Sequence, residues 1–250
     1  MSERRVAIVT GASYGIGQAC AAGLARDGCD VAVTDLRAET LTETEARIKA
    51  DGGRSLALAL DVRSQESVEH AVAAVVDTFG RVDVLVNNAG VPLKRMALDM
   101  TREEWDGVLS VNLTGAFFMS QQVARHLVKA KRPGCIVNIA STHGFIGFPQ
   151  RTTYGISKAG IIHMTKMLAY EWVGHGIRVN AVAPGTVETK TRMDYFQANP
   201  QAHRAMIARI PQQRFGTPDE VAGAVSYLAS PAAEYVTGQT LLLDGGLTSY

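Results

Sequence analysis

Tyr154 and Lys158 are four residues apart in the stretch Tyr-Gly-Ile-Ser-Lys. Apolar side chains recur at three- and four-residue steps over residues 154–173, which predicts a helix. Residues four apart on a helix share one face, so the phenol and the ammonium are expected to be neighbours. A phenol ionises near pH ~10, and an adjacent positive charge favours the phenolate. The spacing therefore predicts a tyrosine that takes a proton from an alcohol or returns one to a carbonyl.

Ser141 offers a third polar group for the same chemistry. It follows the apolar run 135–140, which predicts a strand that ends at this hydroxyl. The hydroxyl could hydrogen-bond the same substrate oxygen as the phenol. The alternative is that the Tyr154–Lys158 pair arises by chance and the lysine is merely solvated. The rest of the chain has to decide between these two interpretations.

A glycine-rich turn near the N-terminus predicts a dinucleotide site. Residues 10–17, Thr-Gly-Ala-Ser-Tyr-Gly-Ile-Gly, join the β-branched run 6–9 to a helical pattern that ends near Gly28. Glycines let the backbone turn tightly and approach a pyrophosphate, whose charge meets the amides of a helix N-terminus. The glycine spacing differs from the commoner Gly-x-Gly-x-x-Gly, and a plain turn is the alternative.

Asp35 closes the next predicted strand, 31–34. A carboxylate at this place can hydrogen-bond the ribose hydroxyls of NAD and repel the 2′-phosphate of NADP. Arg37 is a complication, because an arginine near this position can accommodate that phosphate. Asp35 carries more weight because it is the strand-end residue. The sequence thus predicts NAD as cofactor, with NADP less favoured.

Strand and helix patterns alternate along the remaining chain. Further strands are expected at 55–60, 82–86, 135–140, 177–183 and 240–243, with helices between them. This alternation predicts an α/β fold with one doubly wound sheet, in a single domain spanning residues 1–250. Residues 186–217 contain a mixed stretch without a uniform apolar pattern, and we expect short helices that form a substrate lid.

Amide side chains follow or interrupt two of these elements. Asn87 and Asn88 stand at the carboxyl end of a predicted strand, which suits the floor of a cofactor cleft, although plain turn chemistry is an equal alternative. Asn112 lies close to the apolar face of a predicted helix, where a polar side chain must be paired or hydrated. It could cap a local irregularity or hold a working water.

Composition excludes several other functions. The 250 residues are 46% hydrophobic and 20% charged, with a formal net charge of +1 and no long basic stripe, so neither nucleic acid nor a membrane is an expected partner. Three scattered cysteines and six histidines show no metal-binding spacing, so no metal is expected. The N-terminal apolar run is too short for a signal peptide and no stretch approaches a membrane span, so a cytoplasmic location is expected.

Together these motifs closely resemble the short-chain dehydrogenase/reductase family over essentially the whole chain. The elements that carry the resemblance are the glycine turn 10–17, Asp61, the Asn-Asn-Ala-Gly stretch 87–90, Asn112, Ser141, the Tyr154–Lys158 pair and Pro184-Gly185. The resemblance implies a Rossmann fold with a seven-stranded parallel sheet in the order 3-2-1-4-5-6-7, and commonly a homotetramer.

The resemblance also implies roles for individual residues. Tyr154 would be the acid/base, Lys158 would lower its pKa and bind the nicotinamide ribose, Ser141 would steady the substrate oxygen, and Asn112 would support a proton-relay water. Asp61 and Val62 would hold the adenine ring, while Val187 and Thr189 would meet the carboxamide. The full set of implied cofactor contacts is Gly11, Ser13, Tyr14, Gly15, Ile16, Gly17, Asp35, Asp61, Val62, Asn88, Ala89, Gly90, Tyr154, Lys158, Pro184, Gly185, Val187 and Thr189.

The substrate is less well determined by the sequence. His143 and Arg151 lie at offsets from Ser141 and Tyr154 that would face the reacting carbon, and family members that oxidise hydroxybutyrate are similar in gripping a carboxylate there. Lys94 and Lys190 could add to a positive mouth. The alternative is that Arg151 and Lys94 are solvated surface and His143 only hydrogen-bonds within its loop.

We expect oxidation of a small secondary alcohol (a hydroxy acid, sugar or polyol), with contacts from Ser141, His143, Arg151 and Tyr154. Two other functions stay open. One is an NADPH-dependent reductase of 3-oxoacyl thioesters or ketones. The more remote one is a non-catalytic dinucleotide sensor, which would usually have lost a catalytic residue.

Overall fold

The computed structural model describes residues 4–249 and contains a seven-stranded parallel sheet. The strands follow the order β3-β2-β1-β4-β5-β6-β7, and every neighbouring pair is parallel, which confirms the predicted topology. Their bounds are β1 Val6–Thr10, β2 Asp30–Asp35, β3 Ser55–Ala59, β4 Val84–Asn87, β5 Gly134–Ile139, β6 Ile177–Pro184 and β7 Thr240–Leu243.

The strands of the sheet centre are buried on both faces. Alternate residues of β1 show this: Ala7 and Val9 belong to one apolar cluster, while Val6 and Ile8 belong to another. Side chains alternate across a strand, so a strand with helices on both sides must be apolar throughout. This is why the continuous apolar runs of the sequence become central strands rather than half-exposed ones.

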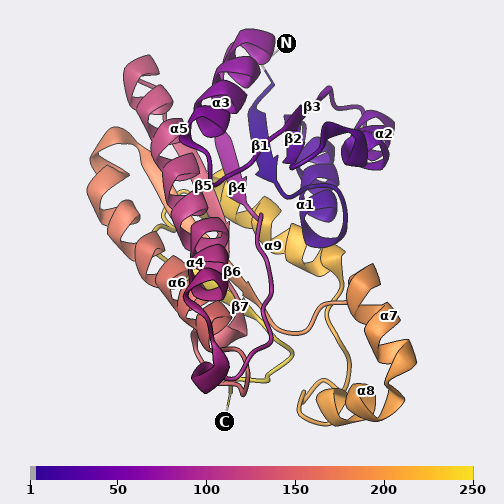
Figure 1. The fold of residues 1–250 in the computed structure, drawn as a ribbon. Helices are drawn as coiled ribbons and strands as arrows, with labels where there is room; N and C mark the ends of the chain where they lie inside the picture. Colours follow the sequence, from indigo (N-terminus) through magenta and orange to yellow (C-terminus); the bar gives the residue numbers. More distant parts are fainter. Residues whose placement is uncertain (1–3, 250) are drawn as a thin grey trace.

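Two helical layers cover the sheet (Figure 1). α1, α2 and α9 contribute to the first apolar cluster, and α3, α5 and α6 contribute to the second, on the opposite face. The helices are α1 Gly15–Arg26, α2 Thr42–Ala50, α3 Gln65–Phe79, α4 Arg102–Leu109, α5 Ala116–Ala130, α6 Thr152–Trp172, α7 Lys190–Ala198, α8 Pro200–Ile207 and α9 Pro218–Ala229. Short 3₁₀ segments lie at Ala38–Leu41, Ala97–Asp99, Thr142–Gly144, Val173–His175 and Pro231–Ala233.

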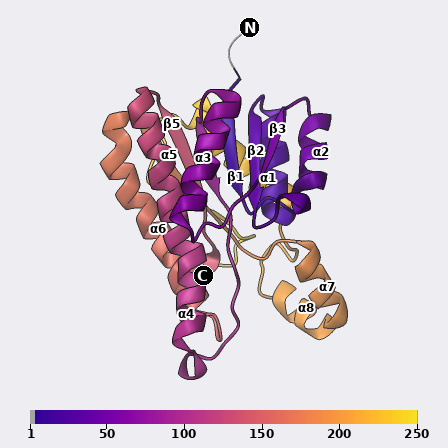
Figure 2. The same cartoon turned by 45° about the horizontal axis from the view of Figure 1, so that its top comes forward.

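α7 and α8 stand apart from both layers, on the side where β6 ends (Figures 1 and 2). They share a small apolar cluster with the C-terminal segment, built around Phe196, Ile210, Phe215 and Leu247. Phe196 stacks on Phe215 with ring centroids 5.1 Å apart. The mixed sequence pattern of this region therefore reflects short helices with a small core of their own.

The order of the strands reverses between β1 and β4, since the chain moves outward to β2 and β3 before it returns to β4. In open parallel sheets a ligand crevice forms at such a point, outside the carboxyl ends of the strands. The residues that follow β1, β2, β4, β5 and β6 are therefore brought to a common edge. None of the helices found between residues 4 and 249 has both the length and the apolar character needed to cross a bilayer.

Candidate active site

Two adjoining cavities lie along the carboxyl edge of the sheet. One contains the glycine turn, and the other contains Ser141, Tyr154 and Lys158. Four residues line both cavities, so the two form one continuous cleft: Ile16, Asn88, Gly90 and Thr189. Most of the expected cofactor contacts line this cleft, namely Gly11, Tyr14, Gly15, Ile16, Asp35, Asp61, Val62, Asn88, Ala89, Gly90, Tyr154, Lys158, Pro184, Gly185, Val187 and Thr189. Ser13, Gly17 and Asn112 do not line it.

The glycine turn is held against β4 at close range. Gly11 and Gly15 have φ angles of +64° and +63°, which side-chain-bearing residues rarely adopt. A Cβ at Gly11 would lie 2.8 Å from the Ala89 Cα, and a Cβ at Gly17 would collide with the Gly11 carbonyl oxygen. Asn88 fastens the turn, because its amide donates to the Thr10 and Gly11 carbonyls at 3.0 and 2.7 Å. Gly17 and the Asn88 side chain thus shape the turn.

This end of the cleft fits the pyrophosphate of a dinucleotide. Tyr14, the residue before α1, makes no side-chain capping bond to the first turn of that helix. The first-turn amides of a helix have no partner within the helix, and together with the helix dipole they attract an anion. Gly11, Gly15 and Gly17 carry no Cβ, and glycines in such a turn let a pyrophosphate approach the backbone.

Asp35 lies at the end of β2 and lines the same cavity. Its carboxylate accepts a 2.6 Å hydrogen bond from the Ser13 hydroxyl and a 2.8 Å bond from the Leu36 amide. These bonds fix a negative charge where the dinucleotide ribose is expected. Arg37 is exposed and is not among the described residues that line either cavity.

Asp61, expected as an adenine contact, lines the cavity and is paired with Arg63. Arg63 pairs with it in a two-pronged geometry, donating from Nε at 2.9 Å and from Nη2 at 2.6 Å. This pairing holds the pKa of the Asp61 carboxyl below its usual range, although burial acts in the opposite direction. Arg63 also lines the cavity, so Asp61, Val62 and this ion pair lie together where the adenine ring is expected.

Tyr154, Lys158 and Ser141 are brought together as predicted. Lys158 is buried on α6, and its Nζ donates a 2.7 Å hydrogen bond to the Ile139 carbonyl at the end of β5. The same Nζ lies 5.8 Å from the centroid of the Tyr154 ring, and Ser141 hydrogen-bonds the Tyr154 side chain. Burial lowers the pKa of Lys158 to about 8. The end of β5 and the first turns of α6 therefore meet at one polar point of the cleft.

The pKa of Tyr154 departs from the expected direction. Burial raises the pKa of the phenol, and this effect outweighs the hydrogen bond from Ser141 and the positive charges of Arg192 and Arg151, which lower it. The surrounding protein therefore favours a protonated Tyr154, the state that can donate a proton to a carbonyl.

Asn112 lies in a π-helical segment, Ser110–Gly115, between α4 and α5. Its side-chain oxygen accepts from the Val91 amide at 2.7 Å, and its amide donates to the Val91 carbonyl at 3.1 Å and to the Ser157 hydroxyl at 3.1 Å. The Ser157 hydroxyl in turn donates to the Tyr154 carbonyl at 2.7 Å. Asn112 was expected either to cap a local irregularity or to hold a water, and the structure shows the irregularity as this π-helical segment. Ser157 links Asn112 to α6, and its position one turn from Tyr154 was the only sequence signal for it.

Asn87 belongs to the sheet interior. Its amide donates to Asn138 on β5 and to Ser120 on α5, both at 2.8 Å, and Asn138 donates to Thr165 on α6 at 2.9 Å. Buried amides need such partners, and this network ties two central strands to the helices that cover them. Asn87 therefore stabilises the cleft floor from below.

His143 and Arg151 both line the Tyr154 cavity. The His143 Nδ1 atom is 3.3 Å from the Ser141 hydroxyl, and its ring packs edge-on to Tyr154 with centroids 5.7 Å apart. Desolvation, followed by the charges of Arg151, Arg192 and Arg209, lowers the pKa of His143 to about 4. The imidazole is therefore neutral near pH 7.

The positive side of the cavity comes from two residues that the sequence analysis did not identify, Arg192 on α7 and Arg209 after α8. The expected Lys94 and Lys190 are exposed and are not among the described residues that line this cavity. Arginines in a mixed, surface-like stretch give no periodic signal. Only the fold of α7 and α8 over the cleft shows where Arg192 and Arg209 lie.

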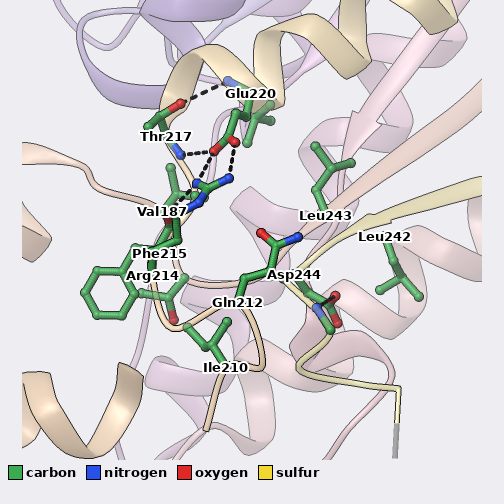
Figure 3. Close-up of a pocket in the computed structure, with 15 residues that line it drawn as sticks. Val187, Ile210, Gln212, Arg214, Phe215, Thr217, Glu220, Leu242, Leu243 and Asp244 are labelled. Atoms are coloured by element: carbon green, nitrogen blue, oxygen red, sulfur yellow. Dashed lines mark hydrogen bonds and ion pairs between the residues drawn. The ribbon is translucent and has the colours of Figure 1, made fainter. Parts of the chain in front are cut away.

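A separate cavity lies between the end of β7 and the start of α9 (Figure 3). Two of its charged groups are paired: Arg214 donates to both Glu220 oxygens, at 2.6 and 2.9 Å, and the Thr217 amide donates to Glu220 at 2.8 Å. This pairing lowers the pKa of Glu220 to about 2. Val187 also lines the Tyr154 cavity, so this paired cluster supports the segment that borders the cleft.

Comparisons with known proteins agree with this geometry. The profile of a family described as Enoyl-(Acyl carrier protein) reductase matches residues 11–248. The chain is 41% identical to the 3-oxoacyl-[acyl-carrier-protein] reductase FabG of Thermotoga maritima, covering 98% of both proteins. The solved structure of a short-chain type dehydrogenase/reductase from Mycobacterium marinum is 35% identical with a TM-score of 0.93, covering 98% of this chain and 96% of that one.

A second solved structure bears on the cofactor. It is a protein of Agrobacterium tumefaciens described as a 2-deoxy-D-gluconate 3-dehydrogenase with bound NADP, 38% identical with a TM-score of 0.91, covering all of this chain and 98% of that one. With the strand order, the glycine turn and the grouping of Ser141, Tyr154 and Lys158 in one cleft, these matches place the chain in the short-chain dehydrogenase/reductase family.

Proposed function

We propose that the protein is an NAD-dependent oxidoreductase that interconverts a small secondary alcohol and its ketone. The observation that carries the proposal is the grouping of Ser141, Tyr154 and Lys158 at one wall of the dinucleotide cleft. The alcohol is a hydroxy acid, a sugar or another polyol, because polar and cationic side chains line the cavity around Tyr154.

Tyr154 is the proton-transfer group of the proposed reaction. In oxidation its phenolate accepts the alcohol proton while the carbon–oxygen bond becomes a carbonyl, and in reduction the phenol returns that proton. Bound NAD⁺ would accept the hydride from the carbinol carbon. Ser141 shares the substrate oxygen, and Lys158, anchored on Ile139, supplies positive charge beside the phenol.

Asn112 and Ser157 hold the backbone of Tyr154 in position. They connect the Val91 backbone to the Tyr154 carbonyl through consecutive hydrogen bonds. A water held beside Asn112 and Lys158 would return the proton to solvent.

The variant Tyr154→Phe tests the proposal, because it removes only the hydroxyl. We expect turnover to fall at least a hundredfold, in the range that a positioned acid/base contributes. NAD binding, measured by titration calorimetry, should stay unchanged. Turnover at a tenth of the parent rate or more would refute the role of Tyr154.

A reductase that acts on 3-oxoacyl thioesters or ketones with NADPH is the second candidate. The raised pKa of Tyr154 favours the protonated phenol that reduction needs. The Thermotoga maritima relative is named for such an activity, and the Agrobacterium structure holds NADP. Asp35 supports NAD instead, because its fixed carboxylate would repel a 2′-phosphate. The ratio of kcat/KM for NADH and NADPH separates the two candidates.

A non-catalytic sensor has little support, because the expected catalytic side chains are all present.

We propose a single domain over residues 1–250, in which residues 186–217 form a lid that closes on the substrate. A homotetramer is supported by apolar side chains exposed along α5 and α6, among them Phe118, Met167 and Tyr170. Light scattering at several protein concentrations tests this assembly. The three cysteines are free buried thiols, which fits the proposed cytoplasmic location.

A further inference from the structure

Three arginines from different segments converge on the cavity that contains Tyr154. Arg151 precedes α6, Arg192 lies on α7, and Arg209 follows α8. The cavity has a volume of about 270 Å³, and none of its described lining residues is an aspartate or a glutamate. Its charged lining is therefore entirely basic.

Arg151 is held in place by the neighbouring backbone. Its Nη1 atom donates a 3.0 Å hydrogen bond to the Leu93 carbonyl, and the Gln150 carbonyl beside it accepts from the Arg95 amide at 3.0 Å. A guanidinium carries five N–H donors, so a single bond to Leu93 leaves donors for a ligand. The position of Arg151 is thus fixed before any substrate arrives.

Arg192 differs from the arginines that are paired with an acidic side chain. Arg54, Arg63 and Arg214 each form a close ion pair with an acid. Across residues 4–249, neither Arg151 nor Arg192 has a carboxylate within ion-pair distance. Although Arg192 as a whole is exposed, nearby protein atoms partly desolvate its guanidinium and lower its pKa, as does the charge of Arg151.

Arg151 and Arg192 shift the pKa values of His143 and Tyr154. Their positive charges contribute to the low pKa of His143 and oppose the effect of burial on Tyr154. Arg209 adds further charge, and its guanidinium lies 4.8 Å from the Phe148 ring centroid, beside His143. Like charges brought together in a partly dry cavity repel one another, and an anionic ligand relieves this repulsion.

We propose that Arg151 and Arg192 form a carboxylate-binding subsite, so that the substrate is a small hydroxy acid whose secondary alcohol lies against Tyr154. This inference rests on the proposed oxidoreductase function and narrows its substrate class. The planar fork of a guanidinium matches a carboxylate through paired hydrogen bonds. The cavity volume of about 270 Å³ suits an acid of a few carbons.

The proposed subsite includes one residue of the proposed lid, because Arg192 lies on α7. Arg192 enters the cavity from the proposed lid, whereas Arg151 and Tyr154 belong to the start of α6. A carboxylate that binds both arginines would join the two parts and draw α7 toward the reacting alcohol. Acidic substrates would therefore promote closure, and neutral alcohols of the same size would not.

The first test compares acids with neutral molecules of the same carbon skeleton. Purified enzyme is assayed with NAD⁺ on 3-hydroxybutyrate against 3-hydroxybutyramide, and on gluconate against glucitol. We expect at least one acid to exceed its neutral counterpart at least tenfold in kcat/KM, the size of a charge-assisted hydrogen bond. Arg192→Gln should reduce this ratio about tenfold or more, mainly through KM. Arg192→Lys should restore only part of it, because an ammonium lacks the fork.

Arg204→Gln is the matched control, since Arg204 is an exposed arginine of α8 that does not line the cavity. It should leave the acid-to-neutral ratio unchanged. The inference would be overturned if neutral alcohols were oxidised as well as the acids, or if Arg192→Gln and Arg204→Gln affected the ratio equally.

A binding measurement separates the subsite from the proposed reaction. The enzyme–NADH complex is titrated with malonate, malonamide or inorganic phosphate while NADH fluorescence is followed. We expect malonate to bind at least tenfold more tightly than malonamide or phosphate, and Arg192→Gln to abolish this difference. Tighter binding of phosphate would overturn the carboxylate assignment. Malonate binding that depends on Arg192, without turnover of any alcohol or ketone, would refute the proposed function and leave the subsite in place.

Discussion

The Nζ atom of Lys158 donates a 2.7 Å hydrogen bond to the backbone carbonyl of Ile139. This bond ties the N-terminal half of α6 to the carboxyl end of β5, two residues before Ser141. Lys158 is therefore both the cation beside Tyr154 and the anchor that fixes α6 against the sheet. Its burial lowers the lysine pKa to about 8, so the anchor is still charged at neutral pH.

Replacing Lys158 by methionine should separate these two roles. We expect kcat to fall about a hundredfold or more, because the phenol loses its cationic neighbour. The free energy of unfolding should fall by about 1–3 kcal/mol, because the buried Ile139 carbonyl loses its partner. Steady-state kinetics and urea denaturation measure the two effects. A kcat within a factor of ten of the parent would contradict the catalytic role of Lys158.

Replacing Asp35 by serine should shift the cofactor preference toward NADP. The substitution removes the fixed negative charge at the end of β2, and charges at about 4 Å interact by about 1–4 kcal/mol near a protein surface. We therefore expect the NADP-to-NAD ratio of kcat/KM to rise about 10- to 100-fold. Arg37→Gln is the control and should leave the ratio nearly unchanged. A ratio that falls sharply in Arg37→Gln would instead make Arg37 the phosphate contact.

Replacing Gly17 by alanine should weaken binding of the dinucleotide. The added Cβ would meet the Gly11 carbonyl oxygen and lie 2.5 Å from the Asn88 amide nitrogen, so the turn must shift. We expect the Kd for NADH to rise at least tenfold, a loss of about 1.4 kcal/mol. Gly107→Ala on α4 is the matched control, because a Cβ there meets nothing within 4 Å. The control should bind NADH normally and be stabilised by about 0.5–1 kcal/mol.

The stability of the protein without cofactor should fall as the pH is lowered from 6.5 to 4. The pKa of His143 is about 4 in the folded protein and 6.5 as its unperturbed value, so the unfolded chain binds the extra proton first. Stability then rises with pH across this window, by on the order of 1–3 kcal/mol from this residue. Chemical denaturation at several pH values measures the slope. His143→Gln should flatten it, and an unchanged slope in that variant would contradict the assignment.

Local sequence patterns were sufficient to predict the strands and the centre of the candidate site. Apolar runs and glycine turns gave strands close to their observed bounds, and the family resemblance supplied the strand order. The helix expected at 154–173 begins and ends within two residues of α6. Four-residue spacing on a helix also placed Tyr154 and Lys158 together, because helical geometry relates such residues whatever the tertiary fold.

The chemistry that depends on distant contacts was decided by the tertiary structure. Arg192 reaches the cavity only because α7 folds beside the carboxyl edge of the sheet, and Lys190, two residues earlier, does not line it. The pKa of Tyr154 likewise depends on how many protein atoms surround the phenol, which no spacing along the chain reveals. The sequence by itself determined the family, the strands and the side chains proposed to react, since periodicity and short motifs encode these. Tertiary packing alone decided which charges line the Tyr154 cavity, because the electrostatic field sums over residues far apart in the chain.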